Sequence, residues 1–326
     1  NLLPGRYFSP TCTAIFETYI ASIPNESADL LVEIADTNAV KYDVFKRSFY
    51  GVSDTLTTYA VINYKGLIDT IYFANSIPIE KDCINRTIAS GNWSDPNIWD
   101  KGTVPGECDS VVIMTGHDLN FDISTQINSL YISPNAIIEI NDSSRILQIG
   151  GPDDGARSLV NGGSLKLVQG KILINGFLKL ETGSAFNMTG GEIVIDGNTG
   201  YRATSSPDGQ HLFDVSSLLD SFSFSRGVLQ IIDPPLGPSS QAINCAYNFG
   251  DSSILKFGDG NSTTFTNNLN GFGGDLLPAQ IGGLIFDAGT KENNRIFINL
   301  SPLTIKSIAD IRSGNFVQTS ELNITH

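Results

Sequence analysis

The fold is decided by the stretch Ser164-Leu-Lys-Leu-Val-Gln-Gly-Lys-Ile-Leu-Ile-Asn-Gly-Phe-Leu-Lys-Leu180. It contains three short segments in which apolar residues recur at every second position: 164–167, 171–174 and 177–180. Lys166 and Lys179 take outward positions between leucines that would face a core. A period of two residues is typical of a β-strand with one buried face. Glycine and asparagine between the segments predict tight turns.

Similar short strands recur from about residue 128 to the end of the sequence. Three such strands with their turns make a unit of about 22 residues, a length at which internal repeats indicate a solenoid. Stacked units would bury a continuous apolar interior and pair each strand with the units above and below it. We therefore predict a right-handed parallel β-helix over residues 128–326, truncated at its C-terminal end. A β-sandwich of short strands is the alternative that this pattern leaves open.

Longer polar segments interrupt the repeat. They are residues 150–157, 196–210, 234–242 and 267–280. Solenoids collect such insertions on one flank, which is often the binding flank. Asparagine recurs at turns, and we expect these residues to stack into ladders of side chains: Asn161, Asn175, Asn187 and Asn198.

Residues 1–82 form a separate block with a different pattern. Alternating segments such as 30–34, 57–63 and 68–73 are separated by polar turn residues. This pattern is typical of a small antiparallel β-sandwich of immunoglobulin-like architecture. We expect a hairpin tip at Tyr64–Gly66. Residues 13–22 could form a helix, but their aromatic and β-branched side chains favour a strand.

Residues 83–127 hold both tryptophans of the chain, Trp93 and Trp99, on either side of a proline turn. We interpret this segment as a tryptophan-rich cap at the beginning of the solenoid, because the terminal units of repeat proteins need one. The other interpretation is that the two indoles are exposed and stack on sugar rings. Tyr201, in a polar insertion, is a third candidate ligand-binding residue.

The run Trp93-Ser-Asp-Pro-x-x-Trp99, Val104-Pro-Gly106, Asp109-x-Val-x-Ile113 and Gly116-His117 resembles the start of a G8-type β-helix module. It is also similar to repeats in very large surface proteins that bacteria export by the type IX route. The resemblance covers roughly residues 90–265. It implies a parallel β-helix and an adhesin-like role at a cell surface.

Composition limits the choice of partners. The chain has 34 acidic and 20 basic side chains and a net charge of -14, which would repel nucleic acid. No apolar run is long enough to span a membrane. The four cysteines form no CxxC pair that would bind zinc. We predict a disulfide between Cys83 and Cys108, which would agree with a secreted protein.

Candidate catalytic residues lie in the polar insertions. Polysaccharide lyases and hydrolases of β-helical architecture need carboxylates near a basic group. Two clusters contain such residues, and their weak candidates are Asp153, Asp154, Arg157, Asp208 and His211. Asp-Asp-Gly and Pro-Asp-Gly are also ordinary turn sequences, so neither spacing dictates a catalytic geometry. The sequence therefore predicts no catalytic residue and favours a non-enzymatic function.

Calcium is the one cofactor that the sequence suggests. Asp-Gly-Asn occurs twice, and its oxygen donors are Asp196, Asn198, Asp259 and Asn261. Neither copy has the full spacing of a strong calcium loop. We expect a secreted or cell-surface structural segment that binds a glycan, another surface protein or a second copy of itself. A carbohydrate-active β-helix enzyme or a carbohydrate-binding module is the alternative.

Overall fold

The computed structural model describes parts of two compact units, residues 1–83 and 84–326. In the first unit it describes only the strands. In the second it describes residues 84–150, 157–196, 211–215, 218–232, 242–260, 271–272, 277–287, 296–299, 302–313, 315–318 and 320–325. The described part is all-β, and its only helical element is the short 3-10 helix η1 (Pro96–Ile98). Residues 13–22, for which the sequence favoured a strand over a helix, lie outside the described residues.

The first unit consists of antiparallel strands. They are β1 (Asp29–Ile34), β2 (Val40–Asp43), β3 (Ser48–Gly51), β4 (Thr55–Leu56), β5 (Thr58–Tyr64), β6 (Leu67–Tyr72) and β7 (Ile77–Pro78). Strand β5 lies between β1 and β6, while β2 pairs with β3 and β4 with β7. Tyr64 pairs with Leu67, so the turn between β5 and β6 lies where the sequence predicted a hairpin tip.

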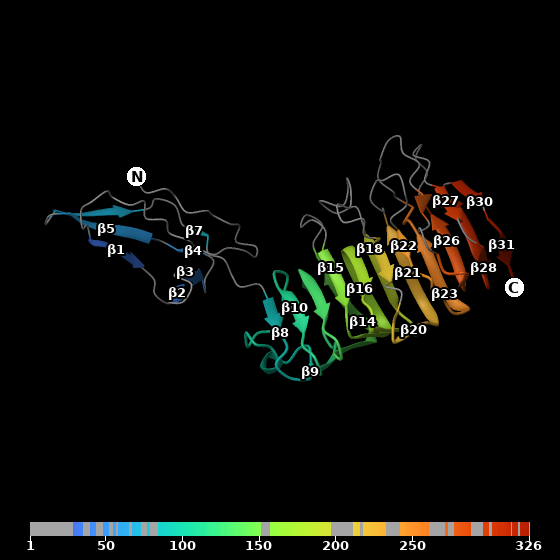
Figure 1. Cartoon of the computed structure of the whole chain (residues 1–326), viewed down its shortest axis with the longest axis horizontal. Coiled ribbons are helices and arrows are strands. Elements are labelled where there is room, and N and C mark those ends of the chain that lie inside the picture. The colour runs from blue at the N-terminus through green and yellow to red at the C-terminus, as the bar shows by residue number, and fades with distance from the viewer. Residues whose placement is uncertain are drawn as a thin grey trace. The chain divides into compact units, whose positions relative to one another are not determined.

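The second unit is built from parallel strands, seen side by side in Figure 1. Its strands pair in three series, which we call columns. Column 1 contains β8 (Ile84–Arg86), β10 (Ser110–Ile113), β13 (Ser129–Ile132), β15 (Arg157–Asn161), the end of β16 (Ser164–Leu180), β19 (Phe213–Val215) and β22 (Ile243–Asn244).

Columns 2 and 3 contain the second and third strands of each layer. Column 2 contains β9 (Gly91–Asn92), β11 (Asp118–Asn120), the start of β14 (Ile137–Ile149), the start of β16, β17 (Ala185–Met188) and β20 (Ser221–Phe224). Column 3 contains β12 (Thr125–Ile127), the end of β14, the middle of β16, β18 (Glu192–Asp196), β21 (Arg226–Ile232), β23 (Ser252–Phe257), β26 (Gly283–Asp287) and β29 (Ala309–Ser313).

Two smaller parallel sheets accompany the last layers. They are β24 (Gly271–Phe272), β27 (Ile296–Asn299) and β30 (Asn315–Gln318), and β25 (Gln280–Ile281), β28 (Leu303–Ile305) and β31 (Leu322–Ile324). In most layers the chain therefore forms one strand in each of the three columns and then returns to the first column, where the new strand pairs with the strand of the preceding layer. The step from Ser110 to Ser129 is among the shortest, and the step from Ala185 to Ser221 is among the longest.

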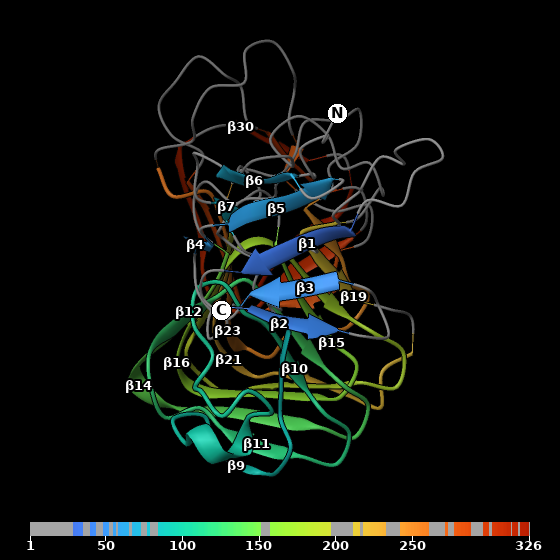
Figure 2. The same ribbon diagram turned by 90° about the vertical axis from the view of Figure 1, so that its left-hand side faces the viewer.

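One apolar cluster fills the space between the columns. Within β16, every second residue is buried, as the alternation in the sequence predicted: Leu165, Leu167, Ile172, Ile174, Leu178 and Leu180. Lys166 and Lys179 lie between them and are only half-buried. Figure 2 shows the strands of successive layers lying one behind another. Each layer thus buries its apolar residues against the layers before and after it.

Candidate functional site

Aromatic side chains close the first layer of the parallel unit. Trp93 and Trp99 are buried, with exposed fractions of 0% and 1%, and their ring centroids lie 5.0 Å apart in an edge-to-face arrangement. Phe121 packs edge-on against Trp93 at 5.2 Å. Such edge-to-face pairs are favoured by the ring quadrupoles. Trp93 and Trp99 lie on the chain between β9 and β10, where no column 3 strand is present, and Phe121 directly follows β11.

The sequence around the tryptophans explains their placement. The side chain of Asp95 accepts a hydrogen bond from the Asn97 backbone and so caps η1, whose first residue is a proline. Ser94 donates two hydrogen bonds to the carboxylate of Asp122, one from its backbone and one from its hydroxyl. The Trp99 indole donates to the carbonyl of Trp93 over 2.9 Å. The Trp-Ser-Asp-Pro-x-x-Trp motif therefore supplies local hydrogen bonds that hold both rings in buried positions.

The burial of both rings bears on the two interpretations of the tryptophans. A sugar ring stacks on an exposed aromatic face, and neither Trp93 nor Trp99 offers one in this structure. Both side chains belong to the apolar cluster, and their role as a cap stays an interpretation. Tyr201 lies outside the described residues.

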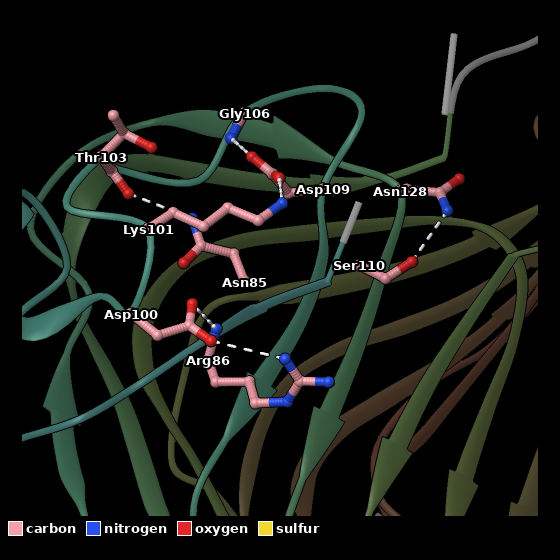
Figure 3. A network of polar contacts seen from close by, with 9 residues as sticks. All are labelled: Asn85, Arg86, Asp100, Lys101, Thr103, Gly106, Asp109, Ser110 and Asn128. Atoms are coloured by element: carbon pink, nitrogen blue, oxygen red, sulfur yellow. Dashed lines mark hydrogen bonds and ion pairs between the residues drawn. The ribbon is translucent and has the colours of Figure 1, made fainter. Parts of the chain in front are cut away.

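A polar network holds the chain between η1 and β10, as Figure 3 shows. Asp100 accepts hydrogen bonds from the backbone and guanidinium of Arg86. Asp109 binds the ammonium of Lys101 at 3.1 Å and accepts a hydrogen bond from the backbone of Gly106. The side-chain amide of Asn85 donates to the carbonyl of Thr103. These contacts join the loop to β8 and to itself, so we assign the network a structural role.

Two of the four cysteines lie among the described residues. Cys108 is half-buried, while Cys83 lies outside the described residues, so the predicted pairing of these two stays a prediction. Cys245 is a free, fully buried thiol whose S–H points to the carbonyl of Tyr247. Burial raises the pKa of the Cys245 thiol to about 12, which makes it a poor nucleophile at neutral pH.

The ends of the column 3 strands are in register with one another. Ile149, Ile174, Ile195, Ile231 and Phe257 pair in succession, each with the equivalent residue of the next layer. Adjacent strands of a sheet are about 4.8 Å apart. The chain therefore leaves column 3 at closely spaced points along one side of the stack. We call this side, between the ends of column 3 and the starts of column 1, the insertion edge.

Three long connections begin at the insertion edge. Residues 150–156 join β14 to β15, residues 197–212 join β18 to β19, and residues 233–242 join β21 to β22. In the layer between β14 and β18, the chain passes from column 3 to column 1 within β16. Asn175 still pairs with Asp196 in column 3, and the next residue, Gly176, pairs with Arg157 in column 1. The turns between columns 1 and 2, and between columns 2 and 3, are much shorter in these layers.

Side-chain amides fix the backbone at this edge. Asn175 donates to the carbonyl of Gly150 in the preceding layer over 2.8 Å. Gln230, which is buried, donates to the carbonyl of Gly258 in the following layer over 2.8 Å. Hydrogen bonds of this kind satisfy carbonyl groups where the strands end. The strand ends from which the long connections start are thus held in place by neighbouring layers.

The candidate catalytic and calcium-binding residues belong to, or flank, connections that start at the insertion edge. Asp153, Asp154, Asn198, Asp208 and Asn261 lie outside the described residues, in connections that follow β14, β18 and β23. At the edge itself, Arg157 begins β15, Asp196 ends β18, His211 precedes β19 and Asp259 follows β23. Sequence reasoning placed these residues in separate insertions, and the strand pairing brings the starting points of the insertions to one side. In the described part of the chain, no group of three metal-binding side chains comes together.

The expected asparagine ladder is wrong for the residues that the structure describes. Asn161 is buried and donates to the carbonyl of Ala185 in the next layer. Asn175 lies at the insertion edge, and Asn187 is exposed in column 2. These three side chains occupy different places in the layer, because the repeat length varies. A pair that does stack is Asn92 and Asn120, whose amides are 3.0 Å apart.

Comparisons with known proteins add no relative to this picture. No protein-family model, curated protein or solved structure matches the chain. Within the residues that are described, no helix is long and apolar enough to cross a membrane.

Proposed function

We propose that residues 84–326 form a right-handed parallel β-helix that acts as a rigid, non-enzymatic binding segment of a secreted or cell-surface protein. The stepwise parallel pairing of the three columns supports the helix, and right-handed crossovers are the rule for parallel strands. The tryptophan motif and its resemblance to the start of G8-type modules support an adhesin-like role. In this proposal residues 1–82 are an antiparallel β-sandwich that precedes the helix.

One observation carries the binding role. The strand ends at the insertion edge are in register, and three long connections start there. Loops on a rigid scaffold are the usual location of binding residues. The acidic chain suits an uncharged glycan or another surface protein better than a polyanion. We therefore propose that the partner binds along the insertion edge.

The chain itself supplies a template for the test. Asn175 pairs in column 3 and Gly176 already pairs in column 1, so the register allows residues 150–156 to be replaced by a single Asn and residues 233–242 by Gly-Phe. We expect both variants to keep the circular dichroism and tryptophan fluorescence of the parent. On a glycan array, the labelled parent should bind a defined subset of glycans, and the shortened variants should lose at least ten-fold in signal.

Lys171→Ala is a matched control, because Lys171 lies on the outer face of column 3, where its ammonium binds Glu192 at 2.8 Å. Its array profile should equal that of the parent. Unchanged binding by both shortened variants would refute the insertion edge as the binding surface.

The enzyme alternative has its own measurement. The purified chain is incubated with acidic and neutral polysaccharides in the presence of Ca²⁺, and new reducing ends and unsaturated sugars are measured. We expect no product. Depolymerisation that is lost in Asp154→Ala or Asp208→Ala would overturn the non-enzymatic proposal and would make the insertion edge an active site.

A further inference from the structure

A buried hydroxyl group joins the first layer of the parallel unit to the second. Thr87 directly follows β8 and is 2% exposed, and its Oγ1 accepts a hydrogen bond from the backbone of Met114 over 2.9 Å. The same oxygen lies 2.8 Å from Nδ1 of His117, in the turn between β10 and β11. Met114 and His117 belong to the second layer, so the side chain of Thr87 bridges the two layers.

The hydrogens available at Thr87 define the state of His117. A threonine hydroxyl has one hydrogen to donate and two lone pairs that accept. One lone pair accepts from Met114, and within the described part of the chain the only other partner of this hydroxyl is Nδ1 of His117. Buried polar groups use their hydrogens, and Nδ1 accepts one only when the imidazole is neutral and carries its proton on Nε2. The arrangement therefore fits a neutral His117 that accepts a hydrogen bond from Thr87.

The first layer is attached to the second by few backbone pairs. Strand β8 pairs with β10 at three positions and β9 pairs with β11 at two, whereas β14 pairs with β16 at nine. Side chains supplement these pairs, for example where Ser90 accepts a hydrogen bond from the backbone of Asp118. Segments with few such contacts have the lowest free energy of local opening. The bond between Thr87 and His117 is therefore a substantial part of what holds the first layer closed.

We propose that His117 is a pH-dependent latch: the first layer is closed while the imidazole is neutral, and it opens locally when His117 is protonated. An imidazole changes its charge between about pH 5 and 8. A proton on Nδ1 turns this atom into a donor that faces the hydroxyl hydrogen of Thr87. Either the two layers then separate at this corner or the hydroxyl hydrogen stays buried without an acceptor, and both outcomes weaken the closed layer. Opening exposes the rings of Trp93 and Trp99.

The latch gives a role to the Gly116-His117 pair of the sequence motif. It concerns the first layer alone, so it does not depend on partner binding at the insertion edge.

Other charged groups surround this corner. They are Asp118, which follows His117 in the chain, Asp122, which accepts hydrogen bonds from Ser94, Glu139 of β14, and the ion pair of Arg86 with Asp100 beside Thr87. Within the described part of the chain, none of them pairs with the imidazole. Carboxyl groups ordinarily titrate at about pH 4 and a guanidinium keeps its charge, so from about pH 5.5 to 8 the change in charge at this corner comes from the imidazole.

Acrylamide quenching of tryptophan fluorescence measures the opening, because both tryptophans of the chain are buried at the first layer. The quenching constant of the purified chain should rise about two-fold from pH 8 to pH 5.5, while the circular dichroism stays constant. In His117→Asn, the side-chain oxygen accepts from Thr87 in place of Nδ1 and does not titrate. Its quenching constant should therefore be the same at both pH values. His211→Asn, which removes another histidine of the parallel unit, should keep the pH response of the parent.

A second variant removes the other partner of the latch. Thr87→Val keeps the shape of the side chain without its hydroxyl, so its quenching constant should exceed that of the parent at pH 8 and should not rise further at pH 5.5. Equal quenching of the parent at both pH values would overturn the proposal. A rise that persists in both His117→Asn and Thr87→Val would overturn it as well, because the response would then come from another group.

Discussion

Glycines of successive layers stack at the turn between columns 2 and 3, and Gly191→Ala is the sharpest test of that stack. Gly191 has a φ of +74°, in the left-handed region that residues with a side chain seldom adopt. A Cβ atom at this position would lie 2.7 Å from the carbonyl oxygen of Gly170, in the preceding layer. The alanine would therefore meet both a conformational and a steric penalty.

The size of the effect follows from these two penalties. A left-handed conformation costs a residue with a side chain about 1–2 kcal/mol. Forcing a methyl group into a packed position costs about 1–3 kcal/mol more. We expect Gly191→Ala to lower the free energy of unfolding by about 2–5 kcal/mol. Gly183 is the matched control, because its φ is +79° and nothing lies within 4 Å of its Cβ position. Gly183→Ala should cost only about 1–2 kcal/mol.

Guanidinium unfolding of the two variants and the parent provides the measurement. Both tryptophans lie in the parallel unit, so their fluorescence reports on this unit alone, and circular dichroism follows the whole chain. The alanine variants share any change in the entropy of the unfolded chain, so their difference isolates the contact with Gly170. If Gly191→Ala is no less stable than Gly183→Ala, the glycine stacking described for this turn is wrong.

Other positions give further predictions. Trp93→Ala should lower the free energy of unfolding by about 3–5 kcal/mol because it empties the cap, and urea unfolding measures this loss. Asp122→Ala removes both acceptors of Ser94 and should cost about 1.5–3 kcal/mol in the same assay, whereas the exposed Asp118→Ala should cost less than about 0.5 kcal/mol. The pKa of Cys245 is raised to about 12 from 9.0, so the unfolded thiol loses its proton first as the pH rises. Stability should thus be complete below pH 9 and should fall between pH 9 and 12, by up to about 1.4 kcal/mol per pH unit, and Cys245→Ala should lack this part of the slope.

The strands of the repeat could be predicted well where alternation is strong. The segments predicted at 164–167, 171–174 and 177–180 all lie in β16, with the predicted residues buried. Strands β11 and β12 escaped prediction, because each has one buried apolar residue, Leu119 or Ile127, and no local period. They form because strands of neighbouring layers pair with them, and those strands lie in other parts of the sequence.

The cap and the insertion edge show what sequence reasoning can and cannot supply. The motif around Trp93 and Trp99 was visible, but only the structure shows that both rings point inward. The sequence around Asp122 does not indicate its role, because its carboxylate accepts hydrogen bonds from Ser94, 28 positions earlier in the chain. Insertions could be found by their polarity, yet their common location depends on register, and the number of residues per layer varies too much to predict it.

Three parts of the parallel unit differ in what they offer a binding partner. At the first layer, the rings of Trp93 and Trp99 are buried. Along the columns, side-chain alternation places one face of every strand in the interior, and ion pairs such as Lys171 with Glu192 occupy part of the outer face. The insertion edge differs from both, because long connections start there from strand ends that neighbouring layers hold in place. A partner that contacts several of these connections at once would therefore meet starting points whose spacing is fixed by the strand pairing.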